Sequence, residues 1–132
     1  MIYIDSNIFI YATINDDKIG EQCRDFLRKV AKKEIKASTS FLTWDEVVYS
    51  IRKNKGKEIS DKEGEKLLKF PNIEFVRVES NIMSKAQEVM VKYNLKPRDS
   101  IHAATAIIKK IKQIKSDDSD FDRIKEMKRV SP

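Results

Sequence analysis

Ile2-Tyr3-Ile4-Asp5-Ser6-Asn7 places an acid directly after three apolar residues and before two polar ones. A short, wholly apolar run is typical of a strand that is buried on both faces of a parallel sheet. The polar residues after it predict the start of a short helix over residues 6–12. Asp5 would then lie at a strand end, which is where ligands bind in open α/β sheets.

Strands alternate with helices along the rest of the chain. Apolar residues recur at helical spacing, as in Cys23, Phe26, Leu27 and Val30. Helices are predicted over 17–33, 44–54, 60–69, 82–93, 97–110 and 121–125, and further strands over 35–39, 73–78, 111–115 and 127–130. This alternation predicts one α/β domain over residues 1–132, with a mainly parallel central sheet flanked by helices on both faces.

The composition excludes several classes of site. One histidine and one cysteine cannot form the usual zinc cages, and a single cysteine cannot form an internal disulfide. The three glycines form neither a P-loop nor a dinucleotide fingerprint. No apolar run approaches the ~20 residues of a membrane span, and no signal peptide is evident, so we expect a cytoplasmic protein. The net charge of +6 is compatible with binding RNA or DNA.

Four acidic positions fall where strands should end or helices begin. They are Asp5, Glu46, Asp99 and the run Asp117-Asp118-Ser119-Asp120. In a parallel sheet these positions can meet at the carboxyl edge of the strands. Carboxylates are the ligands that hard cations such as Mg²⁺ and Mn²⁺ prefer. We therefore expect a carboxylate site for a divalent ion.

Three of these four acidic positions also have a purely structural explanation. Asp5 is a good N-cap for the helix that follows it. Thr43-x-x-Glu46 has the form of a capping box, and from the residues alone this is the favoured explanation of Glu46. Asp99 in a first helical turn is stabilised by the helix dipole. His102 is expected to pack or to form a hydrogen bond rather than to bind metal.

The acidic motifs, taken in order, resemble those of the PIN-domain ribonucleases, in particular the short VapC-type toxins. Asp5-Ser6-Asn7 resembles the opening motif of that family, and Glu46 falls where its second acid stands. The segment from Arg98 to Ala106 resembles the helix that carries the third acid. The segment from Ile114 to Phe121 resembles the closing Thr-x-Asp-x-Asp-Phe, with Ser116 in the place of the commoner threonine.

The resemblance implies a PIN-like fold and an endoribonuclease that requires Mg²⁺ or Mn²⁺. It assigns catalytic roles to Asp5, Glu46, Asp99, Asp118 and Asp120. The metal ligands among them would be Asp5, Asp99 and Asp118, with Asp120 the next choice after Asp118 and Asp117 a bystander. Ser6, Asn7 and Ser116 would support the ligands. The resemblance further implies the toxin of a type II toxin–antitoxin pair, a homodimer, and an antitoxin that blocks the acidic groove with a basic peptide.

The contacts with nucleic acid are less specific in the sequence. The densest basic segment contains Arg52, Lys53, Lys55 and Lys57, and Arg98 lies beside Asp99. These residues are candidates for contact with the RNA backbone, or they are solvated surface charges.

Two other functions remain open from the sequence. One is an RNA-binding PIN-like module without catalysis. The other is a phosphotransfer domain, although Asn7 stands where a haloacid-dehalogenase-type phosphatase needs its second aspartate. A response-regulator receiver needs an aspartate after its central strand, whereas Glu79-Ser80-Asn81 follows Val78.

Overall fold

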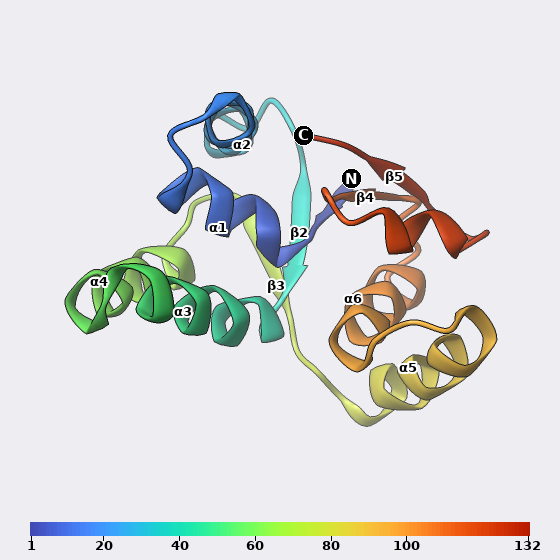
Figure 1. Cartoon of the computed structure of the whole chain (residues 1–132). Helices are drawn as coiled ribbons and strands as arrows, with labels where there is room; N and C mark the ends of the chain where they lie inside the picture. The colour runs from blue at the N-terminus through green and yellow to red at the C-terminus, as the bar shows by residue number, and fades with distance from the viewer.

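The computed structural model describes all residues from 1 to 132, and its centre is a five-stranded sheet in the order β3-β2-β1-β4-β5 (Figure 1). Every neighbouring pair of strands is parallel. The strands are β1 (Ile2–Ile4), β2 (Ala37–Ser40), β3 (Ile73–Val76), β4 (Gln113–Lys115) and β5 (Lys128–Val130). Parallel strands bring their carboxyl ends to one edge, so the residues after β1, β2 and β4 become neighbours there.

Helices cover both faces of the sheet, which confirms the predicted α/β class (Figure 1). Side chains alternate along β1, so Ile2 and Ile4 enter one core and Tyr3 enters the other. The first core is shared with α1 (Ser6–Ile14), α2 (Lys18–Ala31), α3 (Leu42–Lys55) and α4 (Lys57–Leu68). The second is shared with α5 (Ser80–Tyr93), α6 (Pro97–Ile108) and the 3₁₀ helix η1 (Ser119–Arg123).

Several boundaries differ from those predicted, and the largest difference lies between α3 and α4. The helix predicted from residue 60 begins at Lys57, directly after Gly56. Gly56 has a φ of 91°, in the left-handed region that glycine adopts at little cost, so one residue suffices to separate the two helices. The strand predicted over 111–115 is shortened to Gln113–Lys115, and the one predicted over 73–78 ends at Val76.

Helix α6 positions one of the predicted acids. Pro97 occupies the first turn, where its missing N–H costs no hydrogen bond. Ala103, Ala104 and Ala106 are fully buried, and these small side chains let the helix pack closely in the second core. Asp99 therefore lies at the fixed N-terminal end of a buried helix.

No helix in the structure is both long and apolar enough to cross a membrane.

Candidate metal centre

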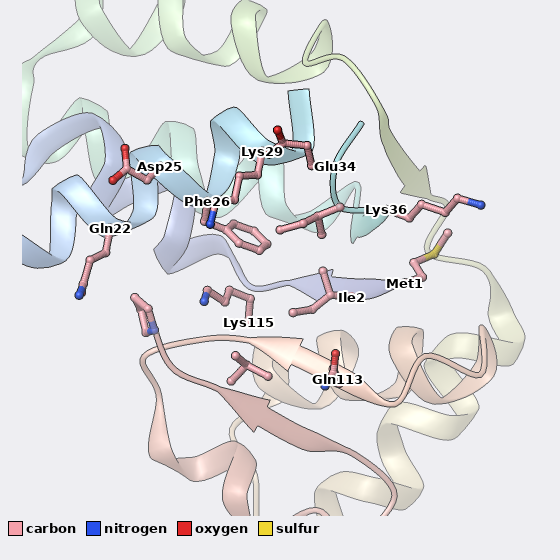
Figure 2. Close-up of a pocket in the computed structure, with 13 residues that line it drawn as sticks. Met1, Ile2, Gln22, Asp25, Phe26, Lys29, Glu34, Lys36, Gln113 and Lys115 are labelled. Carbon is pink, nitrogen blue, oxygen red and sulfur yellow. The ribbon is translucent and has the colours of Figure 1, made fainter. Parts of the chain in front are cut away.

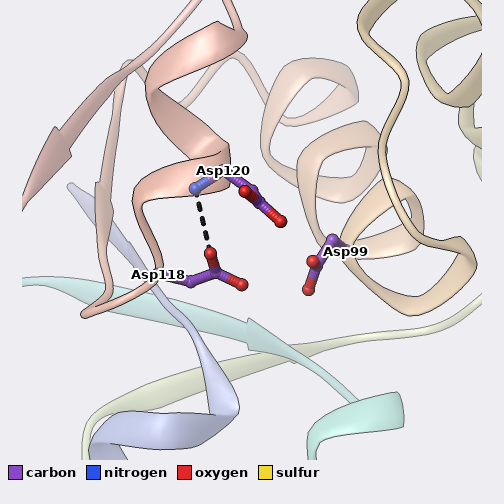
Figure 3. Close-up of side chains that lie close together, drawn as sticks. All are labelled: Asp99, Asp118 and Asp120. Atoms are coloured by element: carbon purple, nitrogen blue, oxygen red, sulfur yellow. Dashed lines mark hydrogen bonds between the residues drawn. The ribbon is translucent and has the colours of Figure 1, made fainter.

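Three aspartates converge at the carboxyl edge of the sheet. Asp99 lies in the first turn of α6, Asp118 caps η1, and Asp120 lies in the first turn of η1. Each offers one carboxylate oxygen, and the three oxygens lie within 4.8 Å of one another (Figure 3). All three residues are partly buried. The fold thus brings together acids that are separated by about twenty residues of sequence.

The loop after β4 holds two of these aspartates in place. Asp118 accepts a hydrogen bond from the backbone N–H of Asp120 at 2.9 Å, which is the dashed line in Figure 3. The Asp120 carboxylate pairs with the Arg123 guanidinium at 3.2 Å. Phe121, which directly follows Asp120, is fully buried in the second core. The buried ring anchors η1 in that core.

Ser116 links this loop to the first strand. Its hydroxyl donates to Oδ2 of Asp5 at 2.6 Å and accepts the backbone N–H of Asp118 at 3.0 Å. It also accepts the side-chain amide of Asn7 at 3.3 Å. Oδ1 of Asn7 accepts a hydrogen bond from the backbone N–H of Asp117 at 3.5 Å. Ser116 and Asn7 therefore join the ends of β1 and β4, and the exposed Asp117 lies outside the group of three oxygens.

Asp5 is 4% exposed and is tied to the protein through both carboxylate oxygens. Its Oδ1 accepts the N–H of Ser6 at 2.7 Å, so it does cap α1 as its sequence position predicted. Its Oδ2 accepts the Ser116 hydroxyl. Asp5 contributes none of the three oxygens that lie within 4.8 Å of one another. Its charge nevertheless raises the pKa of Asp99.

Glu46 begins a largely buried hydrogen-bond chain that joins four elements. Its carboxylate bonds Nε2 of His102 on α6. Nδ1 of His102 bonds the Tyr3 hydroxyl on β1 at 2.6 Å, and that hydroxyl accepts the backbone N–H of Ser40 at 3.0 Å. His102 is fully buried and forms hydrogen bonds, as expected. Tyr3 had no signal in the sequence, because an aromatic residue in an apolar strand is indistinguishable from ordinary core.

The capping box predicted for Glu46 is wrong. Helix α3 is capped at Phe41 without a side-chain hydrogen bond, so Thr43 lies inside the helix. The Thr43 hydroxyl instead bonds that of Thr39 at 2.6 Å. Glu46 is thereby free to reach His102, a contact between residues 56 positions apart that no local pattern could reveal.

The charges of the cluster shift the pKa of its members. Burial, followed by the charges of Asp5 and Asp118, raises the pKa of Asp99 to about 6. Burial also raises the pKa of Asp5, against the charge of His102 and the hydrogen bond from Ser116. Burial alone would lower the pKa of His102, but its bond to Glu46 and the charge of Asp5 together raise it. These acids repel one another, as carboxylates do when no cation lies between them.

The donor set fits a hard divalent cation. Mg²⁺ and Mn²⁺ take oxygen ligands, and Asp99, Asp118 and Asp120 offer three carboxylate oxygens at close range. The only histidine is occupied on both ring nitrogens by Glu46 and Tyr3. Of the five acids predicted for the site, the structure places three in one tight group and holds Asp5 and Glu46 beside it in hydrogen-bond networks.

The predicted basic contacts divide into two places. Arg98 is exposed, precedes Asp99 on α6 and lines a pocket with Glu46. Arg52, Lys53 and Lys55 are exposed in the last turn of α3, and Lys57 begins α4. At 1.5 Å per residue, Lys55 lies roughly 14 Å along the helix from Glu46.

A cavity of about 620 Å³ lies between α2 and the strands β1, β4 and β5 (Figure 2). None of the three clustered aspartates lines it. Lys29, Lys36, Lys115, Asp25 and Glu34 line it, and Lys115 lies over the Phe26 ring at 4.9 Å. None of the predicted site residues borders this cavity.

The chain is similar in structure to several solved proteins. The chain is similar to VapC20 of Mycobacterium tuberculosis, a sarcin–ricin loop cleaving toxin, with a TM-score of 0.77 and 16% identity over 92% of this chain and 93% of that one. It is similar to a chain of VapBC2 from Rickettsia felis, solved on a fragment of its promoter DNA, with a TM-score of 0.77 and 20% identity over 99% and 98%. A chain of DNA-bound VapBC from Salmonella typhimurium gives a TM-score of 0.74 and 15% identity over 98% and 96%.

These likenesses, at such low identity, establish the fold. No curated protein sequence matches the chain. The family model of the PIN domain, however, matches residues 2–127, which is nearly the whole chain. The match includes β1 with Asp5, the α6 helix with Asp99, and the loop with Asp118 and Asp120. The chain therefore belongs to the PIN domain family.

Proposed function

We propose that this protein is an endoribonuclease that hydrolyses RNA phosphodiester bonds with the help of Mg²⁺ or Mn²⁺. The observation that carries the proposal is the group of three carboxylate oxygens within 4.8 Å at the carboxyl edge of the sheet. Membership of the PIN domain family supports it. The description of the similar VapC20 as a toxin that cleaves the sarcin–ricin loop favours RNA as the substrate.

The residues of the site have distinct roles in this account. Asp99, Asp118 and Asp120 would hold the ion, and Asp5 would complete its negative surroundings. A bound divalent ion lowers the pKa of water and stabilises negative charge on the phosphate in the transition state. Ser116 fixes Asp5 and Asp118 relative to each other through its three hydrogen bonds. Glu46 joins α3 to α6 through its hydrogen bond to His102, which lies on the same helix as Asp99.

The protonation of Asp99 sets a condition for this chemistry. With a pKa of about 6 in the metal-free protein, Asp99 carries a proton in an appreciable fraction of molecules in mildly acidic solution. A ligand carboxylate must be ionised, so proton and metal compete for it. Metal binding, and with it cleavage, is therefore expected to weaken below pH 6.

The partners follow from the solved relatives. Several of them are complexes of a toxin with its antitoxin, among them a toxin–antitoxin complex from Klebsiella pneumoniae and VapBC-1 from nontypeable Haemophilus influenzae. By this likeness we propose that the present chain is a toxin with a cognate antitoxin, and the family resemblance further implies a homodimer. Light scattering of the purified protein tests the dimer, and a monomer at micromolar concentration would count against it. Loss of RNA cleavage on adding the product of an adjacent gene would identify the antitoxin.

RNA cleavage tests the proposed activity. End-labelled single-stranded RNA is incubated with the wild type, Asp99→Asn and Asp16→Asn in Mn²⁺, Mg²⁺ or EDTA. Asp16 is exposed and lies outside the cluster, so its variant controls for the loss of one negative charge. We expect cleavage by the wild type and Asp16→Asn in either metal, and a loss of at least ~100-fold in Asp99→Asn.

The other outcomes are also informative. Cleavage that persists in EDTA, or equally in Asp99→Asn, would contradict the proposal. Retention of RNA without cleavage by any of the three proteins would favour the alternative, an RNA-binding module whose acids serve the fold.

A further inference from the structure

A second pocket, of about 370 Å³, lies between α3 and the first turn of α6. It is lined by Asp45, Glu46, Tyr49 and Ser50 of α3 and by Arg98 of α6. Glu46 is shared between this pocket and the network that contains His102, and Arg98 is the neighbour of Asp99. Its volume falls at the lower end of the roughly 300–1,000 Å³ found for ligand sites. The pocket therefore includes Glu46, whose charge acts on the candidate metal ligand Asp99.

Tyr49 is the unusual member of this lining. It is 68% exposed, which is high for an aromatic side chain, and it is the only hydrophobic residue in the pocket. It lies one helical turn from Glu46, on the same side of α3. The ring packs on no other aromatic ring in the structure. An exposed aromatic face offers a stacking surface for a nucleobase, and such stacking is tolerant of base identity.

Arg98 supplies the complementary charge. It is exposed, and it forms no ion pair although Glu46 and Asp45 line the same pocket. Its guanidinium remains available for a phosphate, which it binds through two parallel hydrogen bonds. Asp45 and Glu46 would repel a phosphate inside the pocket, and they accept hydrogen bonds from base amino groups. The chemistry favours a base within the pocket and a phosphate at its rim.

The same side of α3 continues toward basic residues. Lys53 lies one further turn beyond Tyr49, in the exposed last turn of the helix. A strand whose base stacks on Tyr49 would extend its backbone toward Lys53 and the exposed Arg52. An apolar peptide finds no such arrangement, since four of the five lining residues are polar or charged, and Asp45 and Glu46 would repel an acidic peptide.

The geometry points to a nucleotide subsite: Tyr49 stacks on a base of the RNA strand, and Arg98 binds a neighbouring, non-scissile phosphate at the rim of the pocket. This inference rests on the proposed function, because it takes the substrate to be RNA. It gives Tyr49 and Arg98 the task of positioning the strand, with no part in the bond-breaking step.

Binding of a short RNA tests the subsite without relying on cleavage. The probe is a six-nucleotide single-stranded RNA that contains 2-aminopurine, with Ca²⁺ in place of Mg²⁺. Stacking on an aromatic ring quenches 2-aminopurine fluorescence. The proteins are the wild type, Tyr49→Ala, Tyr49→Phe, Arg98→Ala and Lys62→Ala, the last being an exposed residue of α4 outside the pocket.

We expect the Kd to rise about 5- to 150-fold in Tyr49→Ala, in line with about 1–3 kcal/mol for one stacked base. Tyr49→Phe keeps the ring and should restore both the Kd and the quenching to within about twofold of the wild type. Arg98→Ala should weaken binding and reduce its dependence on salt, because one phosphate contact is lost. Lys62→Ala is the control for a lost surface charge.

The outcomes separate this inference from the proposed activity. Wild-type affinity and quenching in Tyr49→Ala would overturn the subsite, even if RNA is cleaved in a metal-dependent way. A loss of binding in Tyr49→Ala that Tyr49→Phe does not restore would also overturn it, since stacking needs only the ring. If Tyr49→Phe restores binding but no cleavage is found with metal, the subsite stands and the proposed nuclease activity fails.

Discussion

Asp99 is a residue whose proposed role as a metal ligand costs the metal-free fold stability. Its carboxylate is partly buried beside Asp5 and Asp118, and its pKa rises from an ordinary 3.8 to about 6. Below pH 3.8 the acid is protonated in both the folded and the unfolded chain. As the pH rises from about 4 to 6 the unfolded chain ionises first, so the folded state loses stability. Above about 6 this loss is complete.

We therefore predict that Asp99→Asn stabilises the metal-free protein at pH 7. One pKa unit corresponds to about 1.4 kcal/mol. Because Asp99 is partly exposed, solvent screening reduces the expected gain to about 1 kcal/mol. The melting temperatures of the wild type and Asp99→Asn are compared in EDTA between pH 3.5 and 7.5. The difference should be small at pH 3.5 and should favour the variant above pH 6.

The exposed Asp16→Asn variant is the control for this comparison, because Asp16 lies outside the cluster. Its melting temperature should follow that of the wild type at every pH. A metal-free Asp99→Asn protein that melts below the wild type at pH 7 would show that Asp99 does not repel its neighbours.

The sequence predicted these residues to differing degrees. Asp5 and Asp99 could be placed because an acid after a buried strand, or in the first turn after Pro97, has a local signature. The partners of Ser116 and Glu46 could not be derived from position alone, since each bond joins residues 56 or more positions apart. The role proposed for Tyr49 could not be predicted either, because an exposed aromatic residue on a helix becomes informative only when its pocket is known.

At the scale of elements, two glycines set how closely helices pack. A Cβ at Gly20 on α2 would lie 2.1 Å from the backbone oxygen of Asn15, the residue that ends α1. A Cβ at Gly64 on α4 would lie 2.8 Å from Cγ2 of Val48 and 3.2 Å from Nε1 of Trp44 on α3. The first obstacle is backbone, whereas the second consists of side-chain ends, one of them on the 40% exposed Trp44.

We predict that Gly20→Ala costs more stability than Gly64→Ala. Alanine favours a helix over glycine by up to about 1 kcal/mol at either position. The clash at Gly20 forces α1 and α2 apart and should cost a net ~1–3 kcal/mol, in the range of overpacked cores. Urea denaturation measures both variants. Equal free energies of unfolding would mean that the α1–α2 turn adjusts as readily as the Trp44 side chain.

Most elements could be predicted because their apolar spacing is strong, as in the buried face of α2. The errors occurred where a single residue ends or joins elements. Gly56 allows α4 to follow α3 without a loop, so the predicted start of that helix came three residues late. The capping box failed for a similar reason, since α3 begins at Leu42 and places Thr43 within the helix.

At the scale of the whole molecule, the parallel sheet creates the site. Strand β1 lies between β2 and β4, so the ends of all three meet at one edge. Asp5 follows β1, Ser40 ends β2, and Ser116 follows β4. The alternation of strands and helices predicted this convergence. It could not predict which oxygens come closest, because that depends on the turn of η1 and the tilt of α6.

The central claim is that this edge binds a divalent ion through Asp99, Asp118 and Asp120, and calorimetric titration of metal-free protein with Mn²⁺ tests it most directly. At pH 7 we predict saturable binding by the wild type and Asp16→Asn, and an affinity at least ~10-fold weaker in Asp99→Asn and Asp118→Asn. Because a ligand that binds only the folded state stabilises it, the melting temperature should rise with Mn²⁺ in the same order. Absence of binding by the wild type, or equal binding by Asp99→Asn, would contradict the account.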